Sequence, residues 1–390
     1  MKPMASHPIA HDLPPLRASL LASIEAGELV GASYTVMRRD GIVSAGCVGY
    51  ADRENSLAMH QDHLFRIYSN TKLVTSCAIL QLVERGKIKL DDPISKYLPS
   101  LASLTVLPPD AQTLNSAVAT HEPIRISHLL THTAGFTYAY REAGTLIGNA
   151  YTEADLANPD MDSERFISTL AHLPLIFQPG TAWNYSVATD VLGVLIEKVS
   201  GYSLDHYFQH NIFDPIGMVD TSFHVPADKA HRLAPMYVCD AQSQTLTKVE
   251  SFPHSGAYVT PQVRLSGGGG LVSSLQDFSK LIITLLQGGH PLLSPEMVRL
   301  MTENQLPKGM WIGKPTVRGQ GHSFAASVIV EENPAFPASF VGDVQWGGVG
   351  GTHWFFSPKD DLGVVLMTQR FMGYGLPFWQ RFKQAVRDTV

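Results

Sequence analysis

The chain has 390 residues, of which 44% are hydrophobic, and a formal net charge of −6 from 29 basic and 35 acidic side chains. This near balance offers no basic surface for nucleic acid, and no stretch reaches the roughly 18 apolar residues of a membrane span. We therefore expect an enzyme with a small-molecule substrate and no nucleic-acid or membrane partner. The sequence does not indicate an oligomeric state.

The cysteines and the first residues bear on the compartment. Cys47, Cys77 and Cys239 lie far apart and form no Cys-x-x-Cys pair, which indicates buried reduced thiols. Residues 1–15 contain no uninterrupted apolar run, so we expect no signal peptide. Both features favour a cytoplasmic location.

The predicted elements begin with a helix at 14–26, where apolar residues recur every three or four positions after a proline. Strands at 30–37 and 42–50 follow, with a hairpin signal at Asp40-Gly41. A helical run at 69–85 ends before Gly86. Further helices are predicted at 126–133, 163–173 and 187–199, with long polar stretches between them.

The second half of the chain returns to strands. One serine and four glycines at 266–270 lead into an apolar helix at 275–286. Strands follow at 323–330, 345–356 and 363–369, then a terminal helix at 378–390. Strands at both chain ends predict a mixed α/β fold, with one antiparallel sheet flanked by helices. In this interpretation residues 1–78 and 225–390 form the α/β body, and residues 79–224 form a mainly helical inserted domain.

Ser69 and Lys72 form the only Ser-x-x-Lys sequence in the chain. On its own this spacing is typical of a helix N-cap followed by a lysine in the first turn. The next residues, 73–83, are almost all apolar, which predicts a buried helix with Ser69 at its positive end and Lys72 one turn on. Burial lowers the pKa of a lysine toward the range in which the amine accepts a proton. A serine hydroxyl needs such a base to become a nucleophile.

Two further segments each allow a structural and a functional interpretation. Tyr185 follows a Pro-Gly turn and precedes a helix, where a phenol either packs at the end of the element or projects into a cleft. Residues 344–351 (Val-Gln-Trp-Gly-Gly-Val-Gly-Gly) contain four glycines. This pattern is typical of a bulged edge strand or of close approach by a ligand.

Four motifs carry a family resemblance. They are residues 65–72 (FRIYSNTK), 128–135 (HLLTHTAG), 179–186 (PGTAWNYS) and 268–274 (GGGLVSS). In this order they resemble the serine β-lactamase-like superfamily of class C β-lactamases and DD-peptidases, and most closely the family VIII carboxylesterases. The resemblance implies the β-lactamase/DD-peptidase-like fold and spans nearly the whole chain.

The resemblance also implies roles at the matching positions. Ser69 matches the nucleophile, Lys72 its partner lysine, and Tyr185 the tyrosine that shares proton transfer with that lysine. Which of the two is the base stays open, because they should titrate as a coupled pair. The backbone N–H groups of Ser69 and Val349 match the oxyanion hole.

Two departures from the β-lactamase pattern favour an esterase. Trp346, followed by Gly347-Gly348, stands where penicillin-recognising relatives carry Lys-Thr-Gly, and Val187 stands where β-lactamases usually carry asparagine. Both lost groups hold the amide and carboxylate of a β-lactam. We therefore predict a serine carboxylesterase for short-chain acyl esters, with no cofactor. The expected substrate-binding residues are Trp346, Gly347, Gly348, Tyr138, Val187 and His353.

Several alternatives stay open at this point. The same scaffold resembles β-lactamases, DD-peptidases, nylon-oligomer amidases, D-amino-acid peptidases and acyl transferases, and a non-catalytic binding protein is a further possibility. No Gly-x-Ser-x-Gly elbow and no phosphate-binding loop occur. His128 and His132 have the spacing of a metal pair but lack a third ligand, so no metal is expected. For His353 a structural role is favoured.

Overall fold

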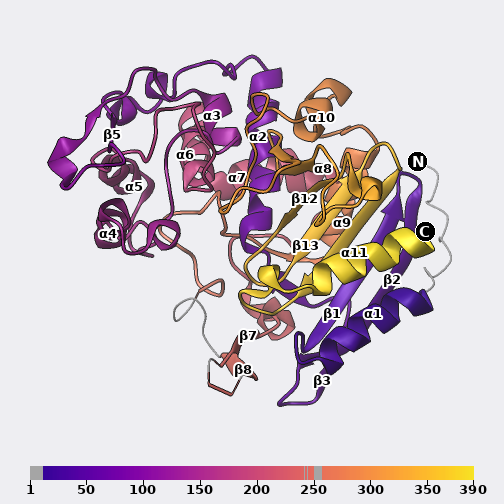
Figure 1. The fold of residues 1–390 in the computed structure, drawn as a ribbon. Coiled ribbons are helices and arrows are strands. Elements are labelled where there is room, and N and C mark those ends of the chain that lie inside the picture. Colours follow the sequence, from indigo (N-terminus) through magenta and orange to yellow (C-terminus); the bar gives the residue numbers. More distant parts are fainter. Residues whose placement is uncertain (1–11, 241, 244, 250–256) are drawn as a thin grey trace.

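The computed structural model describes residues 12–240, 242–243, 245–249 and 257–390; residues 1–11 of the opening segment considered for a signal peptide lie outside this part. An eight-stranded sheet has the order β10-β11-β12-β13-β14-β1-β2-β3, with every neighbouring pair antiparallel (Figure 1). The strands are β1 (Gly31–Arg38), β2 (Gly41–Asp52), β3 (Leu57–Ala58), β10 (Gln320–His322), β11 (Ser327–Ile329), β12 (Val344–Gly347), β13 (His353–Ser357) and β14 (Leu362–Thr368). Because β1 pairs with β14, both chain ends build one sheet, which confirms the predicted fold class.

Helices cover both faces of this sheet. α1 (Pro14–Glu25) and α11 (Phe378–Thr389) lie together on one face, where Tyr34 of β1 meets Phe382 edge-on at 5.2 Å between ring centroids. α9 (Leu275–Leu286) covers the other face and contacts β1 and β14. Alternate residues of the buried strands therefore enter two separate cores. Each buried large apolar side chain contributes about 1.5–3 kcal/mol to this packing.

A helical region lies beside the sheet body. Its elements are α2 (Thr71–Glu84), α3 (Ile126–Leu130), α4 (Leu146–Glu153), α5 (Ser163–Leu170), α6 (Ala188–Ser200), α7 (Leu204–Phe208), α8 (Asp214–Ile216) and α10 (Pro295–Thr302), with short strands β5 (Thr105–Val106) and β6 (Val118–Ala119). In Figure 1, α4, α5 and β5 form a lobe on the left, whereas α2 and α6 lie closer to the sheet. The first turn before α2 is a 3-10 helix, Tyr68–Asn70.

One predicted strand was wrong. Residues 345–356 form two strands, β12 and β13, joined by a turn that contains three of the glycines. The turn is tight. A Cβ on Gly348 would lie 2.4 Å from the carbonyl oxygen of Ile67. Gly351 has a φ of +82°, and a Cβ there would lie 2.3 Å from Thr368 Oγ1. Glycines generally weaken a strand, and at these positions they allow the chain to reverse its direction.

Other sequence predictions hold in part. The hairpin turn is Arg39–Asp40, and Gly41, with a φ of +147°, opens β2. The strand expected at 323–330 is limited to β11, because the Ser323 hydroxyl accepts two backbone N–H groups and makes a turn. All three cysteines are free, but only Cys77 is buried, while Cys47 and Cys239 are partly exposed.

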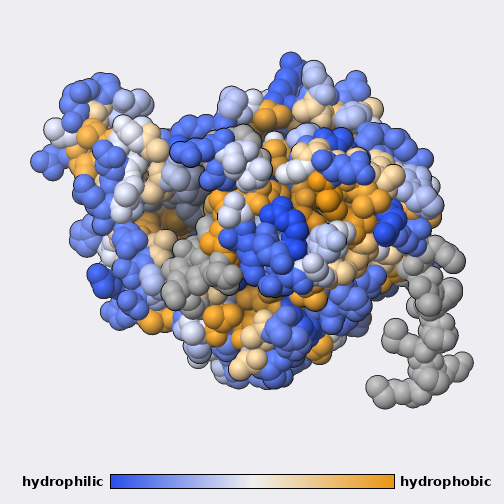
Figure 2. All heavy atoms as spheres, turned by 90° about the horizontal axis from the view of Figure 1, so that it is seen from below, coloured by the Kyte–Doolittle hydropathy of each residue, from blue (hydrophilic) through white to orange (hydrophobic). Residues whose placement is uncertain are grey.

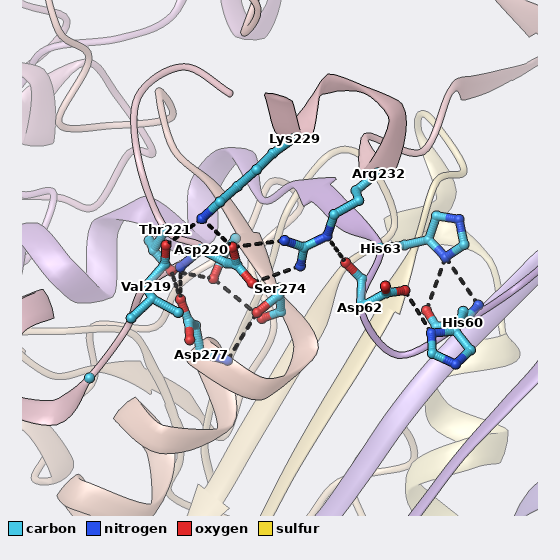
Figure 3. Close-up of polar contacts among 12 residues, drawn as sticks. His60, Asp62, His63, Val219, Asp220, Thr221, Lys229, Arg232, Ser274 and Asp277 are labelled. Carbon is cyan, nitrogen blue, oxygen red and sulfur yellow. Dashed lines mark hydrogen bonds and ion pairs between the residues drawn. The ribbon is translucent and has the colours of Figure 1, made fainter. Parts of the chain in front are cut away.

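A polar network fixes the segment after α8 to the body (Figure 3). Arg232 holds both oxygens of Asp220 at 2.9 and 2.7 Å, and Lys229 donates to the same carboxylate at 2.8 Å. Asp277, at the start of α9, accepts the backbone N–H of Asp220 at 2.6 Å, and Arg232 also donates to the Asp62 carbonyl. The arginine holds the pKa of Asp220 below its usual range. The network thereby ties this segment both to α9 and to the loop before Leu64.

A short strand pair aligns two segments of the chain that are far apart in sequence. β4 (Leu64–Arg66) pairs with β9 (Val272–Ser274), with Phe65 opposite Ser273. β4 leads directly into the 3-10 turn with Ser69, and β9 directly follows the glycine run 266–270. The pairing therefore places that run beside the start of α2. No helix within the described ranges is long and apolar enough to cross a bilayer.

Candidate active site

Ser69 lies on a sharp turn between β4 and α2. The preceding residue, Tyr68, has a φ of +43°, a left-handed conformation that costs a non-glycine residue about 1 kcal/mol or more. The turn is held by a bond from the Asn70 side chain to Thr352 at 2.9 Å and by the Asn70 N–H on the Ile67 carbonyl. This backbone leaves Ser69 partly exposed on a cavity while its neighbours are buried.

The structure brings Ser69, Lys72 and Tyr185 together. The Tyr185 hydroxyl donates to Ser69 Oγ at 2.6 Å, and Lys72 Nζ lies 3.4 Å from the same oxygen. Lys72 Nζ also sits 4.7 Å from the centroid of the Tyr185 ring. Two of these side chains come from one helical turn, and the third comes from 116 residues further along the chain.

Lys72 is buried and has three oxygen neighbours. Its ammonium donates to the Gly268 carbonyl at 2.6 Å and to the Tyr138 hydroxyl at 3.2 Å, in addition to Ser69. Burial lowers the pKa of Lys72 from 10.5 to about 8, although the negative charge of Asp190 opposes the change. At pH 8 about half of Lys72 is therefore neutral, and at pH 7 about a tenth.

Tyr185 keeps its proton. Burial raises its pKa well above 10, and hydrogen-bonding contacts with Ser69 and Trp346 oppose this rise only in part. The phenol is neutral and acts as a donor. Its segment is fixed by the neighbouring Asn184, whose backbone N–H donates to the His132 carbonyl and whose side-chain amide donates to Thr137 Oγ1 at 3.0 Å.

A buried histidine packs against the tyrosine, and a second one packs against the first. The rings of His132 and Tyr185 lie 4.9 Å apart, and His322 lies 5.5 Å from His132 and 5.6 Å from Trp346. Burial lowers the pKa of His322 to about 4 and that of His132 well below 6.5, so both are neutral. Within the described ranges no three His, Cys, Asp or Glu side chains are grouped to hold a metal ion.

The backbone N–H groups expected to form the oxyanion hole lie on adjacent segments. The turn after β12 approaches the 3-10 turn at Ser69 so closely that only glycine fits at 348. Neither the N–H of Ser69 nor that of Val349 donates to another of the described residues, whereas the Val349 carbonyl accepts from Met372 at 2.7 Å. Both donors therefore remain available.

The cavity has a volume of about 1040 Å³ and lies between the α4–α5 lobe and the sheet body. Figure 2 shows a recess between these two parts of the molecule, with apolar side chains near it. Aromatic rings make up much of the wall, and the sequence had indicated only some of them. The aromatic lining residues are Tyr68, Tyr138, Tyr140, Tyr151, Phe166, Trp183, Tyr185, Phe223, Tyr258, Trp346, Phe371, Tyr374 and Trp379.

The structure places most of the expected substrate-binding residues on this wall. They are Tyr138, Val187, Trp346, Gly347 and His353. Gly348 is not among them, because it packs against the Ile67 carbonyl. The His353 ring stacks on Trp379 at 4.8 Å, and burial lowers its pKa to about 3.

Two groups that act on Lys72 were not predicted from the sequence. Gly268 supplies the carbonyl that holds the lysine, and Asp190 on α6 supplies the nearby charge. The glycine run is evident in the sequence, but its link to Lys72 spans 196 positions. Asp190 follows Tyr185 by five residues and carries no motif of its own.

The family is shown by comparison of the whole chain with known protein families. The model of the Beta-lactamase family matches residues 17–376, so the chain belongs to this family of serine hydrolases. This confirms the resemblance indicated by the four motifs.

Individual relatives give a finer comparison. Protein Rv1367c of Mycobacterium tuberculosis (strain ATCC 25618 / H37Rv) is 35% identical over 365 residues, covering 90% of this chain and 89% of that protein. Esterase EstB of Burkholderia gladioli is 30% identical over 375 residues, covering 90% and 91%. The solved structure of EstCE1, a hydrolase with promiscuous acyltransferase activity, superposes with a TM-score of 0.81 at 27% identity, covering 95% and 97%.

Proposed function

We propose that this protein is a serine carboxylesterase that forms an acyl-enzyme on Ser69. The observation that carries the proposal is the contact of Ser69 Oγ with the Tyr185 hydroxyl at 2.6 Å and with Lys72 Nζ at 3.4 Å, at the wall of a large cavity. A hydroxyl between a neutral phenol and a lysine of lowered pKa is arranged for activation as a nucleophile.

In this mechanism Lys72 is the base and Tyr185 the acid. Ser69 Oγ attacks the ester carbonyl carbon while its proton passes to the neutral amine of Lys72, and the N–H groups of Ser69 and Val349 donate to the oxyanion. The tetrahedral intermediate then breaks its bond to the alcohol oxygen, which takes a proton from Tyr185. Lys72 returns its proton to the phenolate. Water attacks the Ser69 ester by the reverse route, and the acid leaves.

The charges on the cavity wall support an ester over a β-lactam. Among the described lining residues the basic side chains are Arg141 and Arg264. Arg141 Nε donates to Asn184 Oδ1. Arg264 donates to the Leu156 carbonyl, and its Nη1 lies 3.6 Å from Asp190 Oδ1. Neither occupies the strand position at which relatives present a lysine, which is taken here by Trp346. A neutral ester needs no such cation.

The size of the cavity refines the substrate class. A volume of about 1040 Å³ lies at the upper end of the range for small-molecule sites and exceeds the need of a short acyl group on a small alcohol. Aromatic rings such as Trp346 and Tyr374 offer stacking surfaces for apolar rings. We therefore propose short-chain acyl esters of bulky, apolar alcohols.

Acyl transfer is the second candidate. The same acyl-enzyme yields a new ester when an alcohol replaces water as the second nucleophile and gives its proton to Lys72. A cavity with space for a bulky acceptor and a largely aromatic wall favours this outcome. EstCE1, which shares the fold, is a hydrolase that also has promiscuous acyltransferase activity.

The test combines labelling with a substrate panel. Mass spectrometry after reaction with a fluorophosphonate should find the adduct on the Ser69 peptide, and Ser69→Ala should take up none. Nitrophenyl butyrate should be cleaved with a kcat/KM at least about a hundredfold above that of nitrocefin, since a missing buried cation costs a few kcal/mol. An adduct on another serine would refute the mechanism. Nitrocefin turnover rivalling the ester would make the protein a β-lactamase. Added alcohol that diverts product into a new ester would favour the transferase.

A further inference from the structure

The glycine run 266–270 is wedged between α2 and α6. A Cβ on Gly267 would lie 2.8 Å from the Thr189 carbonyl oxygen, and a Cβ on Gly268 would lie 2.5 Å from Asp190 Oδ2. Both neighbours belong to α6. Glycines at these two positions are therefore explained by close approach of the helix, with no phosphate ligand involved.

From its other side the run accepts hydrogen bonds from α2. Lys72 Nζ donates to the Gly268 carbonyl at 2.6 Å, and one turn later Thr75 donates to the Gly267 carbonyl at 2.7 Å. The location of the lysine amine thus depends on where these two peptide groups are held.

Asp190 contacts the run on both sides of Gly267. Its Oδ1 accepts the Ser266 hydroxyl at 2.5 Å and the Gly268 N–H at 3.3 Å, and Arg264 Nη1 lies 3.6 Å from the same oxygen. The side chains of Arg264 and Asp190 are 10% and 9% exposed. A buried carboxylate with one incomplete ionic partner exerts its charge on nearby groups with little screening.

We propose that Asp190 is a positioning residue for Lys72, which fixes the Gly268 carbonyl through Ser266 and Gly268 and provides the negative charge that retains the proton on the lysine. The inference rests on the proposed function, in which Lys72 is the base. Arg264 acts in the opposite sense, because its positive charge offsets that of Asp190.

The other groups that face Lys72 are uncharged. Tyr138 and Tyr185 are phenols whose pKa values burial raises, and His132 and His322 are imidazoles whose pKa values burial lowers. Asp190 is the charged group that raises the pKa of Lys72 against the effect of burial. Removal of this charge should favour the neutral amine, and removal of the Arg264 charge should favour the ammonium.

Two variants with opposite expected effects test the proposal in the full-length protein. The readout is the second-order rate of Ser69 labelling by a fluorophosphonate, expressed as the ratio of the rate at pH 6 to the rate at pH 9. Asp190→Asn keeps an oxygen acceptor but removes the charge, and it should raise this ratio about threefold or more. Arg264→Gln should lower it by a similar factor, since one nearby charge contributes on the order of half a pKa unit or more.

Ser266→Ala is the matched control, because it removes one bond to Asp190 and keeps the charge. It should slow labelling at both pH values and leave the ratio unchanged. Equal ratios in wild type, Asp190→Asn and Arg264→Gln would overturn the proposal, as would shifts in the same direction or a shift in Ser266→Ala. If Asp190→Asn does not fold, the direction of the Arg264→Gln shift decides. Full labelling of Lys72→Met would instead refute the proposed function.

Discussion

Replacing Lys72 with methionine should separate the catalytic use of the lysine from the cost of burying it. Lys72 is 4% exposed, and burial lowers its pKa from 10.5 to about 8. In the unfolded chain the pKa returns to about 10.4. Between about pH 8 and pH 10.5 the unfolded state therefore binds more protons than the folded state. Stability rises with pH through this window, and the buried charge costs most below pH 8.

The magnitude follows from the two pKa values. At about 1.36 kcal/mol per pKa unit, burial of the charge costs about 3 kcal/mol at pH 7 and about 2 kcal/mol at pH 9. Lys72→Met removes this cost but leaves the Gly268 carbonyl without its donor, which costs about 1–3 kcal/mol at either pH. The net change at pH 7 is thus small. Between pH 7 and pH 9, however, the wild type should gain about 1 kcal/mol of unfolding free energy relative to Lys72→Met.

Urea denaturation followed by tryptophan fluorescence at pH 7 and pH 9 measures this shift. Lys87→Met, at an exposed position just after α2, is the matched control and should show no pH-dependent difference. Parallel stability curves for Lys72→Met and wild type at the two pH values would refute a lowered pKa for Lys72. Activity should be lost in Lys72→Met whatever its stability.

Three further predictions concern activity. With nitrophenyl butyrate, kcat/KM should rise with pH through an apparent pKa near 8, because only the neutral amine of Lys72 accepts a proton; a flat profile from pH 6 to 9 would exclude it as the base. Tyr185→Phe should lower kcat by about 10²–10⁴-fold, whereas Tyr140→Phe, a matched phenol on the same wall, should have little effect in the same assay. Gly348→Ala should abolish labelling of Ser69, since the added Cβ lies 2.4 Å from the Ile67 carbonyl, while Gly375→Ala, which meets open space, should label normally.

Much of the fold was predictable because periodic patterns report local structure. The helix 275–286 was predicted at the bounds that α9 has, and the N-terminal helix and the first two strands lie within two residues of their predicted ends. The failures occur where tertiary contacts decide the local path. Residues 345–356 have the pattern of one strand, but the glycines at 348–351 allow a turn that presses on Ile67, 281 positions earlier in the chain.

In the candidate site, too, local contacts were predictable from the sequence and long-range contacts were not. Ser69 and Lys72 lie one helical turn apart, so their contact follows from local spacing. Tyr185 was assigned through the family resemblance, since no local pattern links it to Ser69. Asp190 and Gly268 were missed because their contacts join three segments of the chain, and such contacts leave no periodic signal in a single sequence.

These three segments explain why a site can be built around an amine that the fold disfavours. The 3-10 turn before α2 carries Ser69, and the first turn of α2 carries Lys72. α6 follows Tyr185 and carries Asp190, and the glycine run lies between the two helices. A buried ammonium without oxygen neighbours would pay a desolvation cost that its lowered pKa could not offset. The Gly268 carbonyl and the Tyr138 hydroxyl keep the amine in place in either protonation state, and the charge of Asp190 limits how far its pKa falls. An aliphatic residue at 190 would lower the pKa of Lys72 further but release the Gly268 carbonyl. Such a substitution would therefore change both the position of the base and its basicity.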